Sequence, residues 1–351
     1  MRILLVRLRL IGDVVFTTPV IRALRRTFPD AEISYLVESA AAPVLRGNPH
    51  LSELIAVPRR SGLARLRDDV LMARQLRRRR FDLAIDLHGG PRSAWLTLAS
   101  GARRRIGYTI KGRSWMYTDV VQRAPDLTPR HSVANQWDLL APLGLLAPTR
   151  EADAVEMTPD QSAVARVAAA LREAGAENNP LVVIHVSAGN PFRRWPEASF
   201  AAVVEQLVRH DNNRRVLVTS GPSDVKATLR ISADARRRLG PLGHAVLDLP
   251  EFNLAELRAV VDRAAVYIGG DSGPMHIAAT TATPIVALLG PTLPERSMPW
   301  RSEAIFAEAV DMGPLPCRPC HQRTCEPGDF RCLTGIMPER VVAAAERAFR
   351  R

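Results

Sequence analysis

Short apolar runs, each followed by a segment of helical pattern, recur along the whole chain and constrain its fold most. The runs do not alternate with polar residues, which is typical of parallel strands that helices cover on both faces. We predict strands at residues 3–8, 33–37, 54–57, 83–87, 181–185, 216–219, 266–268 and 285–289, and helices that include 18–27, 197–210, 224–238 and 254–264. This repetition predicts an α/β protein with doubly wound parallel sheets.

A break in the pattern near residues 145–180 divides the 351-residue chain into two domains. We expect an N-terminal domain over residues 1–160 and a C-terminal domain over residues 161–337. The last helix, within 338–351, is expected to pack back on the N-terminal domain. Each domain is predicted to be Rossmann-like, and ligands of such sheets bind outside the carboxyl ends of the strands.

The positive charge of the chain lies in its first half. The formal net charge is +12, but residues 1–150 hold 25 basic and 12 acidic side chains, whereas the remainder holds 23 and 24. This distribution excludes a uniformly polycationic protein. Nucleic acid is disfavoured as a partner because aromatic residues are few and no known binding module is present.

Signals of several other protein classes are missing from the sequence. Arginines at positions 2, 7 and 9 interrupt the apolar start, so it lacks the core of a signal peptide. No apolar run approaches the roughly 18 residues that span a bilayer, and we expect a soluble cytoplasmic protein. The Rossmann glycine fingerprint, the P-loop and the H-E-x-x-H motif are absent, which disfavours nicotinamide oxidoreductases and P-loop enzymes.

The first predicted strand leads into a loop that contains Gly12 and Asp13. Glycine allows a tight turn at the end of a strand. A carboxylate at this edge is favoured beside a helix start and can accept a proton from a substrate hydroxyl. A simple turn or capping aspartate explains the same residue.

Two loops of the second half are suited to phosphate. The strand 181–185 is followed by Ser187, Ala188 and Gly189, whose backbone N–H groups can approach an anion, and then by Arg193. An ordinary strand–helix connection with solvated arginines remains an alternative there. The second loop follows the strand 266–268 and opens a helix, which leaves free N–H groups for a diphosphate. It contains Asp271, Ser272, Gly273 and His276.

Four cysteines lie within sixteen residues, at Cys317, Cys320, Cys325 and Cys332. Four thiolates can ligate zinc tetrahedrally, so a structural zinc site is one interpretation, and an iron–sulfur site is another. A thiol-rich loop without metal is equally compatible with this spacing. The clustering argues against a disulfide-stapled secreted scaffold.

Residues 59–80 form a basic segment whose apolar residues recur at helical spacing. A basic amphipathic helix of this kind can lie on an anionic membrane surface. A helix that covers the sheet and keeps its arginines in water is the alternative.

Several motifs together resemble those of the ADP-heptose:lipopolysaccharide heptosyltransferases. The cysteine cluster resembles that of the heptosyltransferase II-like members in particular. The matching segments are residues 11–15 (IGDVV), 185–196, 221–224 (GPSD), 271–276 (DSGPMH) and 289–292 (LGPT). The resemblance covers essentially the whole chain and implies a GT-B glycosyltransferase with two Rossmann-like domains facing a central cleft. It implies that the N-terminal domain binds the acceptor and the C-terminal domain binds the nucleotide-sugar donor. It also implies an inverting transfer of L-glycero-D-manno-heptose from ADP-heptose to a heptose or Kdo hydroxyl of the lipopolysaccharide inner core, at the inner face of the inner membrane, without a cofactor.

The resemblance also implies roles for individual residues. Asp13 matches the general base, residues 187–189 match the phosphate loop, and Asp224 matches the acidic residue that contacts the adenosine ribose. The residues at 271–273 and His276 match the diphosphate- and sugar-binding helix start. Arg193 occupies a position that is often lysine in this family, and it keeps the positive charge. The rival interpretations are another sugar-nucleotide glycosyltransferase acting on a cell-envelope glycan, a basic nucleic-acid-binding protein and a metal-sensing or scaffold protein.

Overall fold

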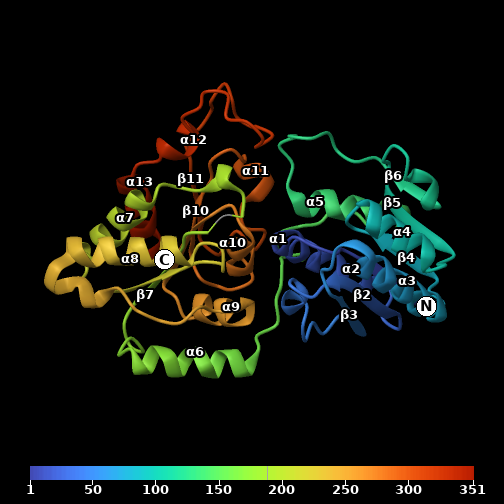
Figure 1. Cartoon of the computed structure of the whole chain (residues 1–351), viewed down its shortest axis with the longest axis horizontal. Helices are drawn as coiled ribbons and strands as arrows, with labels where there is room; N and C mark the ends of the chain where they lie inside the picture. Colours follow the sequence, from blue (N-terminus) through green and yellow to red (C-terminus); the bar gives the residue numbers. More distant parts are fainter. Residues whose placement is uncertain (188) are drawn as a thin grey trace. The chain divides into compact units, whose positions relative to one another are not determined.

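The computed structural model describes residues 1–187 and 189–351 and divides into two compact units (Figure 1). The first unit is Met1–Thr158 and the second is Pro159–Arg351. The division falls two residues before the domain boundary that the sequence pattern indicated.

A six-stranded parallel sheet forms the centre of the first unit. Its strands are β1 (Arg2–Val6), β2 (Glu32–Glu38), β3 (Glu53–Val57), β4 (Leu83–Asp86), β5 (Arg104–Tyr108) and β6 (Asp119–Val121). The strand order β3-β2-β1-β4-β5-β6 is that of a dinucleotide-binding Rossmann domain. The order reverses between β1 and β4, so the loops that follow these two strands flank the point where such sheets bind ligands.

The helices of the first unit lie between these strands along the chain and, for α5 and η3, after β6. They are α1 (Ile11–Val15), α2 (Thr18–Thr27), α3 (Gly62–Arg78), α4 (Pro91–Ala99) and α5 (Ser132–Trp137), with the short 3₁₀ helices η1 (Ala42–Val44), η2 (Ser114–Met116) and η3 (Asp138–Leu143). The C-terminal half of α3 contributes Leu76 and α4 contributes Leu96 to a core over Leu4, Val6 and Ala84. Burial of this apolar surface is the main force that holds the helices on the sheet.

A five-stranded parallel sheet forms the centre of the second unit. Its strands are β7 (Leu181–His185), β8 (Arg215–Thr219), β9 (Val266–Gly270), β10 (Ile285–Leu288) and β11 (Ala307–Val310). The order β11-β10-β9-β7-β8 is the flavodoxin-like arrangement, and its reversal lies between β7 and β9. Both sheets are doubly wound and parallel, which confirms the predicted fold class.

The helices of the second unit cover both faces of this sheet. They are α6 (Gln161–Glu173), α7 (Glu197–His210), α8 (Val225–Leu239), α9 (Leu254–Asp262), α10 (Gly273–Ala278), α11 (Pro294–Ser297), α12 (Arg331–Thr334) and α13 (Pro338–Phe349), with η4 (Pro191–Arg193) and η5 (Gly240–Ala245). The helices α7, α8 and α13 share one hydrophobic core with the strands. Helix α9 packs against both α6 and α10.

Helix α13 is part of the second unit. Val341, Ala344 and Ala345 are buried in the core of that unit, and the helix contacts α7, β9, β10 and β11. The apolar face of α13 is thus covered by α7 and the sheet of its own unit, and the packing of residues 338–351 on the first domain stays a prediction.

Within the part of the chain that the structure describes, no helix combines the length and the apolar character needed to cross a membrane.

Candidate functional site

The loop after β1 places Asp13 beside the strand-order reversal of the first sheet. The chain leaves β1 through Arg7 and enters the five-residue helix α1, whose first turn contains Asp13. The residue that turns the chain is Leu10, which has a φ of 70° and is 65% exposed. The sequence analysis assigned the turn to Gly12, which instead lies inside α1. A leucine in the left-handed region is a strained conformation, and such strain tends to persist where the surrounding structure fixes a functional loop.

Arg7 holds the Asp13 side chain in place. Its guanidinium forms an ion pair with the Asp13 carboxylate and donates a hydrogen bond of 2.6 Å to the carbonyl oxygen of Leu87, after β4. The Arg7 side chain is 10% exposed and the Asp13 side chain is 28% exposed. One carboxylate oxygen is therefore tied to a nearly buried cation, and the side chain still reaches solvent, where a substrate hydroxyl would approach.

His88 lies at the same edge of the sheet and was missed by the sequence analysis. Burial lowers its pKa to about 4, and the charges of Arg7 and Arg9 act in the same direction, whereas Asp13 opposes them. The imidazole is therefore neutral near pH 7. A histidine directly after the strand 83–87, followed by two glycines, is the signal that would have found it.

The β4–α4 turn that carries His88 is fixed by a buried carboxylate. Asp86 is fully buried, and its Oδ1 accepts hydrogen bonds from the backbone N–H groups of His88 and Gly89. Its Oδ2 accepts hydrogen bonds from Ser93 Oγ at 3.0 Å and Tyr117 Oη at 2.6 Å. Burial raises the pKa of Asp86. The network makes this turn a rigid support for the edge of the sheet.

In the second unit, the loops after β7 and β8 are joined through Ser187. Its hydroxyl oxygen accepts a hydrogen bond of 2.8 Å from the backbone N–H of Gly221. A Cβ atom built on Gly189 would meet none of the described residues within 4 Å, so the space at this position is open. Ala188, which the sequence analysis placed in the same phosphate loop, lies outside the described residues. Ser187 and Gly189 thus follow β7 at the carboxyl edge of the sheet.

The loop after β9 carries a buried charge cluster. Asp271 is 3% exposed, and its carboxylate lies 2.9 Å from Arg193 Nη1 and 3.6 Å from His276 Nε2. Burial alone would raise the Asp271 pKa, but the hydrogen bond with His276 and the charge of Arg193 outweigh it and hold the pKa at about 2. The structure therefore brings together three residues that the sequence analysis had taken from two separate loops.

The same loop leads into the short helix α10. Ser272 precedes α10, and Gly273 is the first residue of that helix. Ser272 Oγ is buried and has no hydrogen-bond partner among the described residues. An unsatisfied buried hydroxyl costs free energy unless a ligand or water completes it, so this oxygen is available to a polar ligand.

Asp224 lies at the start of α8, after β8. Its carboxylate accepts a hydrogen bond of 2.7 Å from Ser223 Oγ and lies 3.2 Å from Arg194 Nη2. The residue is buried, with 8% of its surface exposed. The structure thus places Asp224 at the carboxyl edge of the sheet that also carries Ser187 and Asp271.

Gln322, in the cysteine-rich segment, contacts this edge and was missed by the sequence analysis. Its Oε1 accepts hydrogen bonds from Arg193 Nε at 2.7 Å and Asn190 Nδ2 at 3.0 Å. Its Nε2 lies 3.4 Å from Thr292 Oγ1, after β10. A glutamine in a loop gives no sequence signal for such a contact, because its partners are 129 and 132 residues away.

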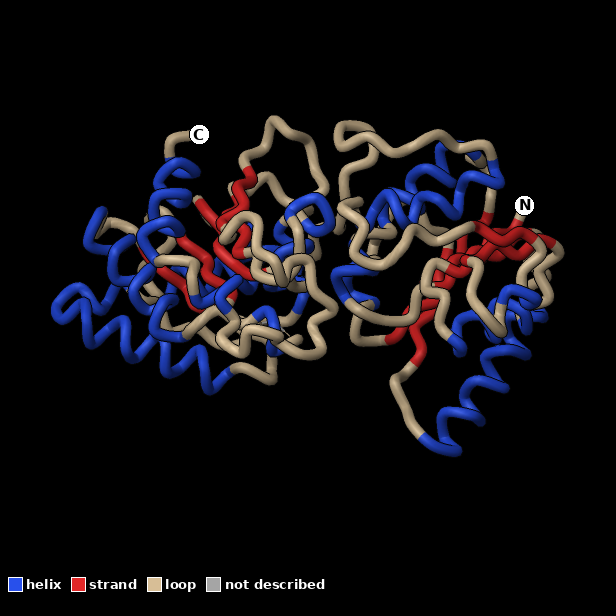
Figure 2. The backbone as a smooth tube through the Cα atoms, turned by 90° about the horizontal axis from the view of Figure 1, so that it is seen from above, coloured by secondary structure: helices blue, strands red, loops and turns tan. Residues whose placement is uncertain are grey.

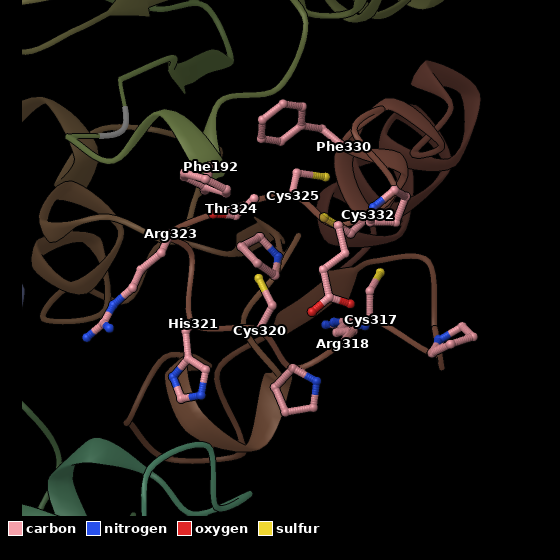
Figure 3. Close-up of a pocket in the computed structure, with 15 residues that line it drawn as sticks. Phe192, Cys317, Arg318, Cys320, His321, Arg323, Thr324, Cys325, Phe330 and Cys332 are labelled. Carbon is pink, nitrogen blue, oxygen red and sulfur yellow. The ribbon is translucent and has the colours of Figure 1, made fainter.

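The cysteine-rich segment surrounds a cavity of about 360 Å³. All four cysteines line it, together with the aromatic rings of Phe192 and Phe330 (Figure 3). Each cysteine is a free thiol. Burial raises the pKa of Cys332 to about 11, so this thiol is protonated near neutral pH.

The proposed zinc site is not assembled in this structure. Among the described residues, no group of three histidine, cysteine, aspartate or glutamate side chains is placed to hold a metal ion. Cys332 lies in α12, whereas the other three cysteines lie on the preceding loop. All four line one cavity, and the zinc expectation is unsupported among the described residues.

Comparison with known proteins identifies the family. The family model for glycosyltransferase family 9 (heptosyltransferase) matches residues 70–329. The chain is 29% identical over 314 residues to a lipopolysaccharide heptosyltransferase 3 of Escherichia coli, covering 89% of this chain and 90% of that protein.

Solved structures agree in fold. A glycosyl transferase family 9 structure from Veillonella parvula superposes with a TM-score of 0.84 at 23% identity, covering 99% of this chain and 97% of the other. The E. coli ADP-heptose lipopolysaccharide heptosyltransferase II superposes with a TM-score of 0.79 at 21% identity, covering 99% and 98%. The fold is that of the GT-B heptosyltransferases. With three quarters of its length matched by the family model, the chain belongs to glycosyltransferase family 9, the heptosyltransferases, and is a glycosyltransferase.

Proposed function

We propose that this enzyme transfers L-glycero-D-manno-heptose from ADP-heptose, with inversion, to a hydroxyl of the lipopolysaccharide inner core. The observation that carries the proposal is the polar cluster at the strand-order reversal of the second sheet. There, Arg193, Asp271 and the buried hydroxyl of Ser272, which has no hydrogen-bond partner among the described residues, border the loops that suit a nucleotide diphosphate. The names of the matched relatives supply the sugar and the acceptor class.

The second unit would bind the donor. Arg193 carries a guanidinium that can bind two phosphate oxygens, and Gln322 and Asp271 hold it in place. The backbone N–H groups beside Gly189 are suited to the diphosphate because the space above that residue is open. Asp224 would accept a hydrogen bond from a ribose hydroxyl.

The first unit would supply the base. In the proposed step, the Asp13 carboxylate takes the proton from the acceptor hydroxyl, whose oxygen forms a bond with the anomeric carbon of heptose. The bond from that carbon to the diphosphate breaks on the opposite face, and ADP leaves with the electron pair. Arg7 keeps the carboxylate oriented, and a positioned base of this kind contributes roughly 10²–10⁴ in rate.

The Asp13→Asn variant tests the role of the base. We expect transfer from ADP-heptose to fall by about 10²–10⁴, because the amide cannot accept the proton. ADP affinity should stay unchanged, since the expected donor residues lie in the second unit. Product formation from ADP-heptose and ADP titration by calorimetry measure the two quantities. Transfer at the wild-type rate by a folded Asp13→Asn enzyme contradicts the assignment.

The acceptor is tested with lipopolysaccharides truncated at successive inner-core positions. Transfer to one truncation, with the anomeric configuration of the product read by NMR, identifies the hydroxyl and the stereochemistry together. Retention of configuration would contradict the inverting step. Turnover of other sugar nucleotides in preference to ADP-heptose would favour the second candidate, a glycosyltransferase acting on another cell-envelope glycan.

A further inference from the structure

The first three turns of α3 expose apolar side chains that nothing in the proposed reaction uses. Leu63 is 84% exposed, Leu66 is 56% exposed, and Val70 and Leu71 are 44% and 46% exposed. At 100° per residue, these four side chains project to one side of the helix. Single exposed leucines are common on protein surfaces, but four exposed apolar side chains on one side of a 17-residue helix form an apolar strip.

The packing of α3 leaves this strip exposed to solvent. Only Asp69 and Leu76 of the helix are buried, and Leu76 belongs to the core of the first unit. Residues 61–67 are all exposed. Figure 2 shows the start of this helix standing away from the rest of its unit. The C-terminal half therefore anchors the helix, and the N-terminal half is presented to the surroundings.

Arginines share the outward face with the leucines. Arg67, Arg74 and Arg78 fall on the same side by helical spacing, and none of them has an ion-pair partner among the residues that the structure describes. The two acidic residues of α3 point elsewhere, since Asp68 lies 3.3 Å from Arg60 and Asp69 lies 2.7 Å from Arg92. The outward face is thus apolar and cationic, without a carboxylate.

We propose that this face of α3 docks on an anionic lipid surface. The leucines would enter the boundary between headgroups and acyl chains, and the arginines would lie at the lipid phosphates. Charge complementarity selects an anionic partner, and the exposed leucines select a lipid over a nucleic acid, which offers no apolar phase to receive them. This docking goes beyond sugar transfer and can be measured without any turnover.

The experiment is sedimentation of the full-length protein with vesicles of pure phosphatidylcholine or of phosphatidylcholine with phosphatidylglycerol. We expect binding to the anionic vesicles alone. The Arg67→Gln/Arg74→Gln variant should bind about thirtyfold more weakly, because each basic residue near an anionic surface contributes roughly a fivefold factor. The Leu63→Gln/Leu66→Gln variant should lose roughly tenfold or more.

Matched controls separate this face from general charge and hydrophobicity. Arg46→Gln/Arg103→Gln removes the same charge at two exposed positions of the same unit. Leu146→Gln/Leu229→Gln removes two leucines that are 87% and 60% exposed. We expect both controls to bind like the wild type, and thermal melting checks that all four variants are folded.

Three results would overturn the proposal. The first is failure of the wild-type protein to bind anionic vesicles. The second is an equal loss of binding in the controls. The third is a loss on arginine replacement with none on leucine replacement, which would indicate a soluble polyanion, such as RNA, in place of a lipid surface.

Discussion

At the scale of single residues, the orientation of Arg193 depends on a side chain from a distant loop. Gln322 accepts a hydrogen bond from Arg193 Nε, while Asp271 binds the other side of the guanidinium. We expect Gln322→Ala to weaken ADP binding about fivefold, the value of roughly one hydrogen bond. Gln161→Ala, at an exposed position of the same unit, is the control. Calorimetric titration with ADP measures both, and an unchanged affinity in Gln322→Ala would show that Arg193 needs no such support.

The residues of the candidate site could be predicted only in part. Asp13, Asp224 and Asp271 follow strands in the sequence, and the structure places each at the carboxyl edge of its sheet. The ion pairs that orient them could not be predicted, because Arg7 and Arg193 resemble many other arginines in this arginine-rich chain. The turn at Leu10 was assigned to Gly12, because glycine is the usual left-handed residue.

At the scale of the elements, strands with an apolar run were predictable, including the edge strands β3 and β8, whereas β5, β6 and β11 were not. The predicted runs at 3–8 and 181–185 correspond to β1 and β7. Strand β5 begins with Arg104 and Arg105, and β6 is three residues long. The two arginines of β5 are half-buried and β6 is largely uncovered, so neither sequence has the apolar run on which the prediction depends.

Helix α13 is held to the second unit by an ion pair as well as by its apolar face. Arg214, whose side chain is 7% exposed, forms a two-point ion pair with Glu346, and its guanidinium lies 4.0 Å from the centre of the Phe349 ring. We expect Glu346→Gln to lower the free energy of unfolding by roughly 2 kcal/mol, less than for a fully buried pair. Glu339→Gln, at an exposed position of the same helix, should have little effect in the same denaturation experiment.

The same pair predicts a pH dependence. The hydrogen bond from Arg214 lowers the Glu346 pKa below its ordinary value of 4.5. The ion pair therefore contributes its full stabilisation above the unfolded-state pKa of Glu346. This stabilisation is lost as the pH falls through the lower pKa of Glu346 in the folded protein. The stability difference between the wild type and Glu346→Gln should shrink in acid. A difference that is constant down to the acid limit of folding would contradict the ion pair.

At the scale of the whole molecule, charge is distributed unevenly between the units. The first unit holds 25 basic and 15 acidic side chains, and the second holds 23 and 21. The excess positive charge thus lies in the unit that is proposed to meet the anionic acceptor, and the nearly balanced unit would hold the diphosphate with a few directed groups.

Hydrogen exchange in the presence of ADP tests the proposed donor and acceptor roles of the two units. We expect saturating ADP to protect the backbone amides of the loops after β7, β8 and β9 most strongly, because a ligand stabilises the state that binds it. Uridine diphosphate at the same concentration should protect them less. Protection confined to the loops after β1 and β4 would reverse the assignment of donor and acceptor units.

The two units are each contiguous in sequence and meet at one peptide bond, between Thr158 and Pro159. Their strand orders also differ, so the halves are distinct architectures and not copies of one module. A recombination event at this junction would break a single covalent link and leave both hydrophobic cores whole. Under the proposed roles of the two units, exchange of residues 1–158 between family members would change acceptor preference while the second unit is inherited intact.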